Sequence, residues 1–144
     1  MFAISAINIG GRVSIIAWED FTLKTFRTNC ETPQFKHLYQ QHNISMVQVT
    51  CPKTINNNTN GYSEGVGEIG LFAFYLTGNV GITHYVEWRG NAFTADDEEK
   101  WPVSQQEIDK TLAGMMSSKA VHAGGITAFN PDQMIVDYYP ISRI

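Results

Sequence analysis

Three features that often reveal a function are scarce in this sequence of 144 residues. There are only two cysteines, no apolar run approaches the length of a membrane-spanning helix, and the N-terminus lacks the basic start and long apolar core of a secretion signal. Charged residues make up only 17% of the chain and apolar residues 43%, a balance that disfavours extensive disorder. We therefore expect a single folded domain spanning residues 1–144, located in the cytoplasm and making no membrane contact.

The two cysteines, Cys30 and Cys51, lie too far apart in the sequence for a Cys-x-x-Cys redox or zinc motif. In the reducing environment of the cytoplasm, cysteines are normally kept in the thiol form. We therefore expect both side chains to be free thiols and neither to belong to a metal site.

The net charge of −4 is distributed unevenly along the chain. Residues 1–60 contain five basic and three acidic side chains, a net charge of +2, whereas residues 61–144 contain five basic and eleven acidic side chains, a net charge of −6. This balance excludes a broad basic surface for phosphates. Any contact with nucleic acid would have to be local, and the N-terminal part is the favoured side.

Motifs that carry catalysis or cofactor binding are also scarce. Gly65, Gly67 and Gly70 have the spacing of a dinucleotide-binding fingerprint, but they open a predicted strand and not a helix. The acidic run at 96–99 lacks the alternating oxygen ligands of an EF-hand and is expected to be a solvated loop. No nucleophile elbow and no P-loop occur. We therefore expect no cofactor, no metal site and no catalytic residue.

The clearest structural pattern lies at residues 69–88. The first half, 69–76, is apolar on both faces, as expected for a central strand covered on two sides. In the second half, 80–88, apolar and polar residues alternate, which is typical of a half-buried strand. Gly78 and Asn79 between the two halves tolerate positive φ. The segment therefore predicts a β-hairpin around which the rest of the chain packs.

Other strands are expected on both sides of this hairpin. Apolar segments at 2–9 and 13–18 are separated by two glycines, a pattern typical of a tight turn between strands, and the alternation at 21–26 extends the second strand or adds a third. Residues 55–67 are rich in Asn and Gly and are expected to form a loop. Further strands are predicted at 44–50, 126–129 and 134–141.

Two helices are expected as well. A Thr-Pro pair at 32–33 is typical of a helix start, and apolar residues follow at helical spacing up to His42. A capping box at 104–107 precedes apolar residues at helical spacing up to Met116. The chain is therefore expected to have an α+β fold, with a small curled mixed β-sheet or β-barrel and two flanking helices.

His84 and Glu87 are the residue types that acid–base catalysis or metal binding would use. Because they are three positions apart on a predicted strand, their side chains point to opposite faces, and a shared site is not expected. The rings of Tyr75, Trp88 and Trp101 lie in or just after the predicted hairpin. Flat rings beside polar groups are typical of a pocket for a planar ligand, and equally of core packing.

The two halves of the hairpin, residues 72–79 and 80–86, resemble the paired strands of PUA-like domains, particularly the EVE and ASCH groups. In these domains a strand ends in an aromatic pair and a short polar turn, and the next strand has a Gly-Ile core. The resemblance implies a small β-barrel with flanking helices that binds RNA or a modified base in a cleft. It implies cleft positions for Tyr75, Thr77, Gly78 and Asn79.

Two classes of function are consistent with these patterns. The first is a PUA-like, non-enzymatic module that recognises RNA or a modified base or nucleotide in an aromatic-lined cleft. The second is a protein-binding or inhibitory module, of the immunity or phage type, that uses its acidic loop or an edge strand. A small hydrolase with His84 as its base is a third hypothesis. The candidate ligand-binding residues are Tyr75, Thr77, Asn79, His84, Trp88 and Arg89.

Overall fold

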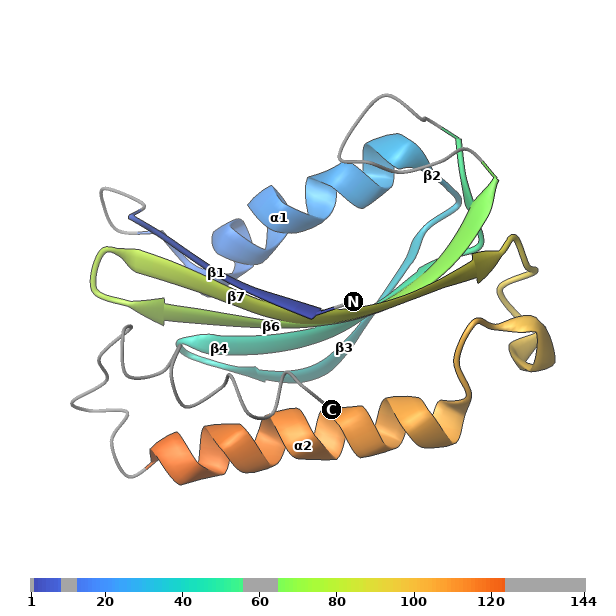
Figure 1. Cartoon of the computed structure of the whole chain (residues 1–144). Helices are drawn as coiled ribbons and strands as arrows, with labels where there is room; N and C mark the ends of the chain where they lie inside the picture. The colour runs from blue at the N-terminus through green and yellow to red at the C-terminus, as the bar shows by residue number, and fades with distance from the viewer. Residues whose placement is uncertain (1, 9–12, 56–64, 124–144) are drawn as a thin grey trace.

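The computed structural model describes residues 2–8, 13–55 and 65–123, which form three layers, with an antiparallel sheet between helices α1 and α2 (Figure 1). The sheet contains five of the described strands, in the order β1-β7-β6-β4-β3. Strands β2 and β5 pair separately as a short ribbon. The strands are β1 (Phe2–Asn8), β2 (Cys30–Glu31), β3 (Gln34–Gln41), β4 (Ile44–Cys51), β5 (Lys53–Thr54), β6 (Val66–Thr77) and β7 (Val80–Asn91), and the helices are α1 (Ile15–Asn29), η1 (Glu98–Lys100) and α2 (Gln105–Ala123).

The predicted central hairpin is confirmed and consists of β6 and β7. The two strands pair in unbroken register from Val66 opposite Asn91 to Thr77 opposite Val80. The turn between them uses Gly78, whose φ of 54° is the conformation that glycine adopts without a steric penalty. Since β4 pairs with the other side of β6, this strand lies at the centre of the sheet.

The alternation of side chains along β6 separates two apolar clusters. Phe72 and Phe74 face α1, where Phe26 of the helix meets Phe72 edge-on with ring centroids 5.5 Å apart. Leu71 and Ala73 belong to the cluster beneath α2. The sheet therefore has an α1 face and an α2 face, and both are covered, which explains why the central strand is apolar on both sides.

The predicted C-terminal helix is also confirmed, as α2. The Oγ of Ser104 accepts a hydrogen bond from the backbone N–H of Glu107 at 3.2 Å and caps the first turn. Ile108, Leu112 and Met115 recur at helical spacing and pack against the α2 face. Neither α1 nor α2, over the residues that the structure describes, is long and apolar enough to cross a membrane.

Strands predicted at 13–18 and 21–26 are wrong, because these residues form helix α1. Ser14 caps the helix by accepting a hydrogen bond from Ala17 N at 3.1 Å. Trp18 and Phe26 then face the sheet at helical spacing, whereas Phe21 is exposed. The abundance of Ile and Thr favours a strand locally, but burying one helical face against the sheet outweighs this weak preference.

The helix predicted at 33–42 is also wrong, because Gln34–Gln41 form the edge strand β3. A β-bulge between His37 and Tyr39 shifts the register with β4. As a result Phe35 packs on the α1 face, whereas Leu38 and Tyr39 both pack against the α2 face. The bulge therefore produces apolar spacing that imitates the stripe of a helix.

The predicted α+β class with two flanking helices is confirmed. The sheet itself is not mixed, and its described strands do not close into a barrel. All its strand pairs are antiparallel, including β4, which confirms the strand predicted at 44–50. Strands β1 and β3 form its edges, and no strand in the described ranges closes the sheet. The strands predicted at 126–129 and 134–141, the glycines at 10–11 and most of the loop at 55–67 lie outside the described residues.

Cys30 and Cys51 form a disulfide, so the prediction of two free thiols is wrong. Cys30 follows the last turn of α1 and Cys51 ends β4, and their Cα atoms are 5.7 Å apart, a separation that suits a disulfide. Helix α1 runs across the sheet and brings Cys30 next to Cys51. The spacing of the two cysteines in the sequence does not reveal this contact. Because disulfides are typical of oxidising compartments, the cysteines no longer support a cytoplasmic location.

Candidate functional site

Three of the six predicted ligand-binding residues lie between the sheet and α2. Tyr75 and His84 are buried, and Trp88 is partly buried against the same apolar cluster. Tyr75 lies opposite Ile82 and Trp88 lies opposite Ile69, so six positions of the β6–β7 register, roughly 20 Å, separate the two rings. The two rings therefore do not form the two sides of one small cleft.

The remaining three lie elsewhere. Thr77 is partly exposed at the end of β6, and Asn79 is exposed in the turn. Arg89 is ten residues along β7 from Asn79, roughly 30 Å away for an extended strand, and its side chain faces α1. The six residues are thus divided between two faces of the sheet and one turn, and the structure does not bring them together.

His84 is fully enclosed on the α2 face, opposite Ala73 of β6 and Ile4 of β1. Burial lowers the pKa of its imidazole to about 4, so the ring is neutral at physiological pH. Glu87 faces α1, where its carboxylate contacts Arg89, which confirms that His84 and Glu87 point to opposite faces. An enclosed ring cannot reach a substrate without rearrangement, so its position gives no support to the hydrolase hypothesis.

Glu68, Glu87 and Arg89 form a buried polar cluster on the α1 face. We call its two glutamates the carboxyl pair. Glu68 lies opposite Arg89 in β7 and opposite Cys51 in β4, and its side chain is completely enclosed. The Arg89 guanidinium lies 3.7 Å from Glu68 Oε1 and 3.4 Å from Glu87 Oε2. One cation therefore faces two carboxyl groups in a region with little solvent.

This arrangement keeps Glu68 protonated at neutral pH. Burial is the main cause, and together with the negative charge of Glu87 it raises the pKa of the carboxyl group from 4.5 to about 8, because Arg89 lowers the pKa by less. Burial and the same glutamate also raise the pKa of Tyr85 on the same face. Of the three side chains in the cluster, Arg89 is the most exposed, at 31%, whereas Glu68 and Glu87 are buried.

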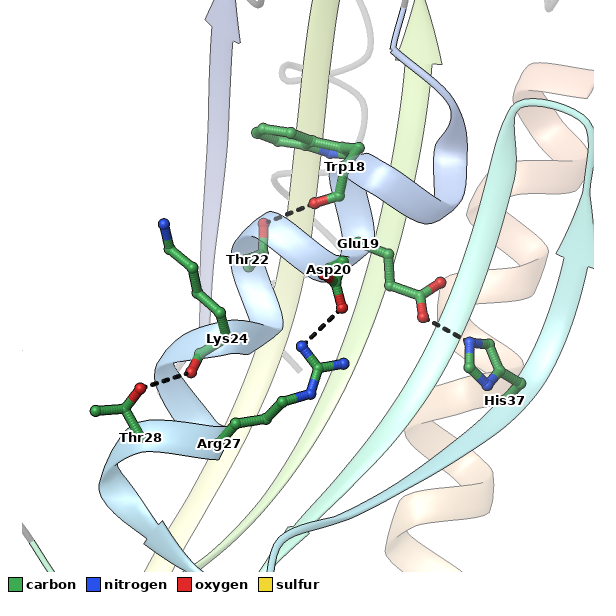
Figure 2. A network of polar contacts seen from close by, with 8 residues as sticks. All are labelled: Trp18, Glu19, Asp20, Thr22, Lys24, Arg27, Thr28 and His37. Atoms are coloured by element: carbon green, nitrogen blue, oxygen red, sulfur yellow. Dashed lines mark hydrogen bonds and ion pairs between the residues drawn. The ribbon is translucent and has the colours of Figure 1, made fainter.

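A second polar network joins α1 to strands β3 and β4. Glu19 pairs with His37 Nε2 at 2.5 Å (Figure 2). It also accepts a hydrogen bond from Ser45 Oγ at 2.7 Å. These are the residue types of a Ser-His-acid triad, but there the histidine lies between the serine and the acid. Here the carboxylate lies between them and Ser45 is buried, so His37 cannot activate the serine. The network anchors α1 over the sheet.

An open pocket of about 570 Å³ lies at the end of the sheet where β7 leaves it. One wall is formed by the β2–β5 ribbon and Pro52, and the other by the segment after β7 together with η1. The backbone N–H of Phe93 donates to the carbonyl oxygen of Pro52 at 3.0 Å and joins the two walls at the base. We call this the β5 pocket; it is lined by Glu31, Thr32, Pro52, Lys53, Ala92, Phe93, Thr94, Ala95, Asp96 and Lys100.

The β5 pocket combines hydrogen-bond donors, acceptors and one aromatic ring. Lys53 comes from one wall and Lys100 from the other, and each has a carboxylate nearby, because Glu31 pairs with Lys53 in register and Asp97 lies 3.4 Å from the Lys100 ammonium group. The ring of Phe93 is largely buried. The lining of the pocket is therefore mostly polar and close to neutral in charge, with one aromatic side chain.

Sequence reasoning identified none of the residues that line the β5 pocket. The acidic run at 96–99 is predicted only as a solvated loop, and the sequence patterns predict neither β2 nor β5. One local signal was present: Thr32 precedes a proline and adopts a φ of 48°, which is uncommon outside glycine. The strand pairing that places Lys53 opposite Glu31 is a tertiary feature that no local sequence pattern predicts.

Comparison of the chain with protein-family models, with curated proteins and with solved structures gave no match. Within the described ranges, no three His, Cys, Asp or Glu side chains gather so as to hold a metal ion. A proposal about function therefore rests on the pocket and its side chains.

Proposed function

We propose that this protein is a binding module that holds a nucleobase or nucleoside in the β5 pocket. The proposal retains the ligand class that the PUA-like resemblance implies and moves the site from the hairpin turn to the end of the sheet. The observation that carries it is a 570 Å³ pocket whose two walls each contribute a lysine and whose lining includes a largely buried phenylalanine.

The size and the chemistry of the β5 pocket support this ligand class. Its volume lies within the range of about 300–1,000 Å³ that is usual for small-molecule sites. The edge of a base presents both donors and acceptors, which ammonium and carboxylate groups can satisfy together. A site for polyphosphate or for duplex DNA would instead be uniformly basic, whereas Glu31 and Asp96 also line this pocket.

Binding of free nucleosides and of short single-stranded RNA tests the proposal. We expect saturable binding by calorimetry, with NMR shift changes at residues 52–54 and 92–96. Because a hydrogen bond to a charged group contributes about 1.5–3 kcal/mol, Lys53→Ala or Lys100→Ala should each weaken binding roughly 10- to 100-fold. Lys110→Ala, which changes an exposed lysine of α2, is the matched control and should leave affinity unchanged.

The same experiment separates the β5 pocket from the hairpin. Asn79→Ala and Trp88→Ala should not alter affinity if the ligand occupies the pocket. With unchanged binding in the lysine variants, weaker binding of Asn79→Ala alone would place the site at the turn, and weaker binding of Trp88→Ala alone would place it beside Trp88, since these residues lie roughly 30 Å apart along the strand. No nucleoside or oligonucleotide binding at millimolar ligand would refute the proposal as a whole.

A further inference from the structure

Within residues 2–8, 13–55 and 65–123, strand β1 is a regular edge strand whose outer side pairs with no other strand. It pairs with β7 over seven consecutive positions, and no other strand in the described residues pairs with it. Ser5, Ala6 and Ile7 are exposed, and the strand contains neither a charged residue nor a proline. An uncharged, regular edge of this kind is a template for another strand, because its outward backbone groups are available for hydrogen bonding.

The opposite edge of the sheet has features that prevent such pairing. Strand β3 carries Lys36 and His37, and the bulge between His37 and Tyr39 breaks its regular register. Charged side chains and bulges are the devices by which proteins protect edge strands from association. Only one of the two edges is protected, so the open edge at β1 is a specific feature of this fold.

Exposed apolar side chains flank the β1 edge on the α1 face. Ile7 lies opposite Gly81 of β7 and is 43% exposed. The Trp18 ring covers Gly81 so closely that an added Cβ there would lie 2.7 Å from it. Phe21 stacks on Trp18 with ring centroids 5.9 Å apart and is 55% exposed. Since Glu19 on the other flank of α1 contacts β3 and β4, Phe21 lies on the flank that faces β1.

We propose that β1 pairs antiparallel with β1 of a second copy, so that the two sheets become one continuous sheet. The two-fold axis of such a dimer is perpendicular to the sheet and leaves α1 on the same face in both copies. With residues 3–7 of the two strands paired about Ser5, the Ile7 side chains and the Phe21 flank of both copies lie on the α1 face of the seam. A single bound peptide strand would satisfy the open edge but would leave Phe21 uncovered, which favours a second copy as the occupant.

Charge is consistent with this pairing at the seam and opposes it at long range. Because β1 has no charged side chain, self-pairing brings no like charges opposite each other. The whole chain carries a net charge of −4, so two copies repel each other at a distance. Dimerisation should therefore strengthen as salt screens this repulsion.

Sedimentation of the full chain from low micromolar to near-millimolar concentration tests the proposal. We expect a reversible monomer–dimer equilibrium, and Ile7→Lys should raise the dimer dissociation constant at least roughly tenfold. Ile16→Lys is the matched control, since Ile16 is 60% exposed and lies on α1 about 160° around the helix from Trp18, which covers the sheet. It should dimerise as the unmodified chain does.

Hydrogen exchange locates the interface independently. Backbone amides of residues 3–7 should become protected as protein concentration rises, whereas those of β3 should not. A chain that is monomeric throughout the concentration range, equal dimerisation of the Ile7→Lys and Ile16→Lys variants, or a dimer without new protection at residues 3–7 would each overturn the proposal.

Discussion

Glu68→Gln should stabilise the protein at neutral pH and should have little effect in acid. Gln keeps the shape of the protonated glutamate and can donate to Glu87, but it cannot ionise. In the folded protein the pKa of Glu68 is raised from 4.5 to about 8. Between these values the unfolded chain releases a proton that the folded protein retains, so this residue costs stability as pH rises from 4.5 toward 8.

The magnitude follows from the shift in the pKa of Glu68. Each pKa unit corresponds to about 1.4 kcal/mol, so the full interval corresponds to about 5 kcal/mol, of which about 3 kcal/mol is lost by neutral pH. We therefore expect Glu68→Gln to gain about 1–3 kcal/mol in unfolding free energy at neutral pH.

Urea denaturation followed by tryptophan fluorescence, repeated at several values from below pH 4.5 to above pH 8, measures this gain. The difference between Glu68→Gln and the unmodified chain should be small in acid and grow with pH. Glu99→Gln, which makes the same chemical change on the exposed η1 helix, is the control and should show no such trend. A difference for Glu68→Gln that does not change with pH would refute the reasoning.

Three further predictions concern stability and charge. Phe74→Ala should lower the unfolding free energy by about 3–5 kcal/mol in chemical denaturation, because Phe74 is completely buried at the centre of the sheet, and an unchanged melting temperature would contradict this. Cys51→Ser should cost about 3 kcal/mol, as should reduction of the disulfide, since the bond closes a segment with a sequence separation of 21, whereas equal stability under oxidising and reducing conditions would contradict the pairing. Fluorescence anisotropy should detect no binding to arbitrary duplex DNA at micromolar protein and physiological salt, and tight, salt-sensitive binding would reveal a basic surface that the charge distribution does not indicate.

The sequence by itself determined the elements whose local signals agree with their tertiary environment. The hairpin of β6 and β7 has apolar alternation, a glycine turn and β-forming residues that all favour the same structure. Helix α2 has a capping serine and an apolar stripe of the correct period. Because propensity, periodicity and turn chemistry coincide in these segments, packing only reinforces what the local sequence specifies.

Tertiary structure decided the elements in which these signals disagree. The Ile- and Thr-rich segment of α1 became a helix because one of its faces could be buried against the sheet, and the bulge in β3 gave a strand the apolar spacing of a helix. The same holds for every candidate site. The disulfide, the carboxyl pair and the β5 pocket join residues from separate strands, and their distances depend on strand order and register, which no window of neighbouring residues contains.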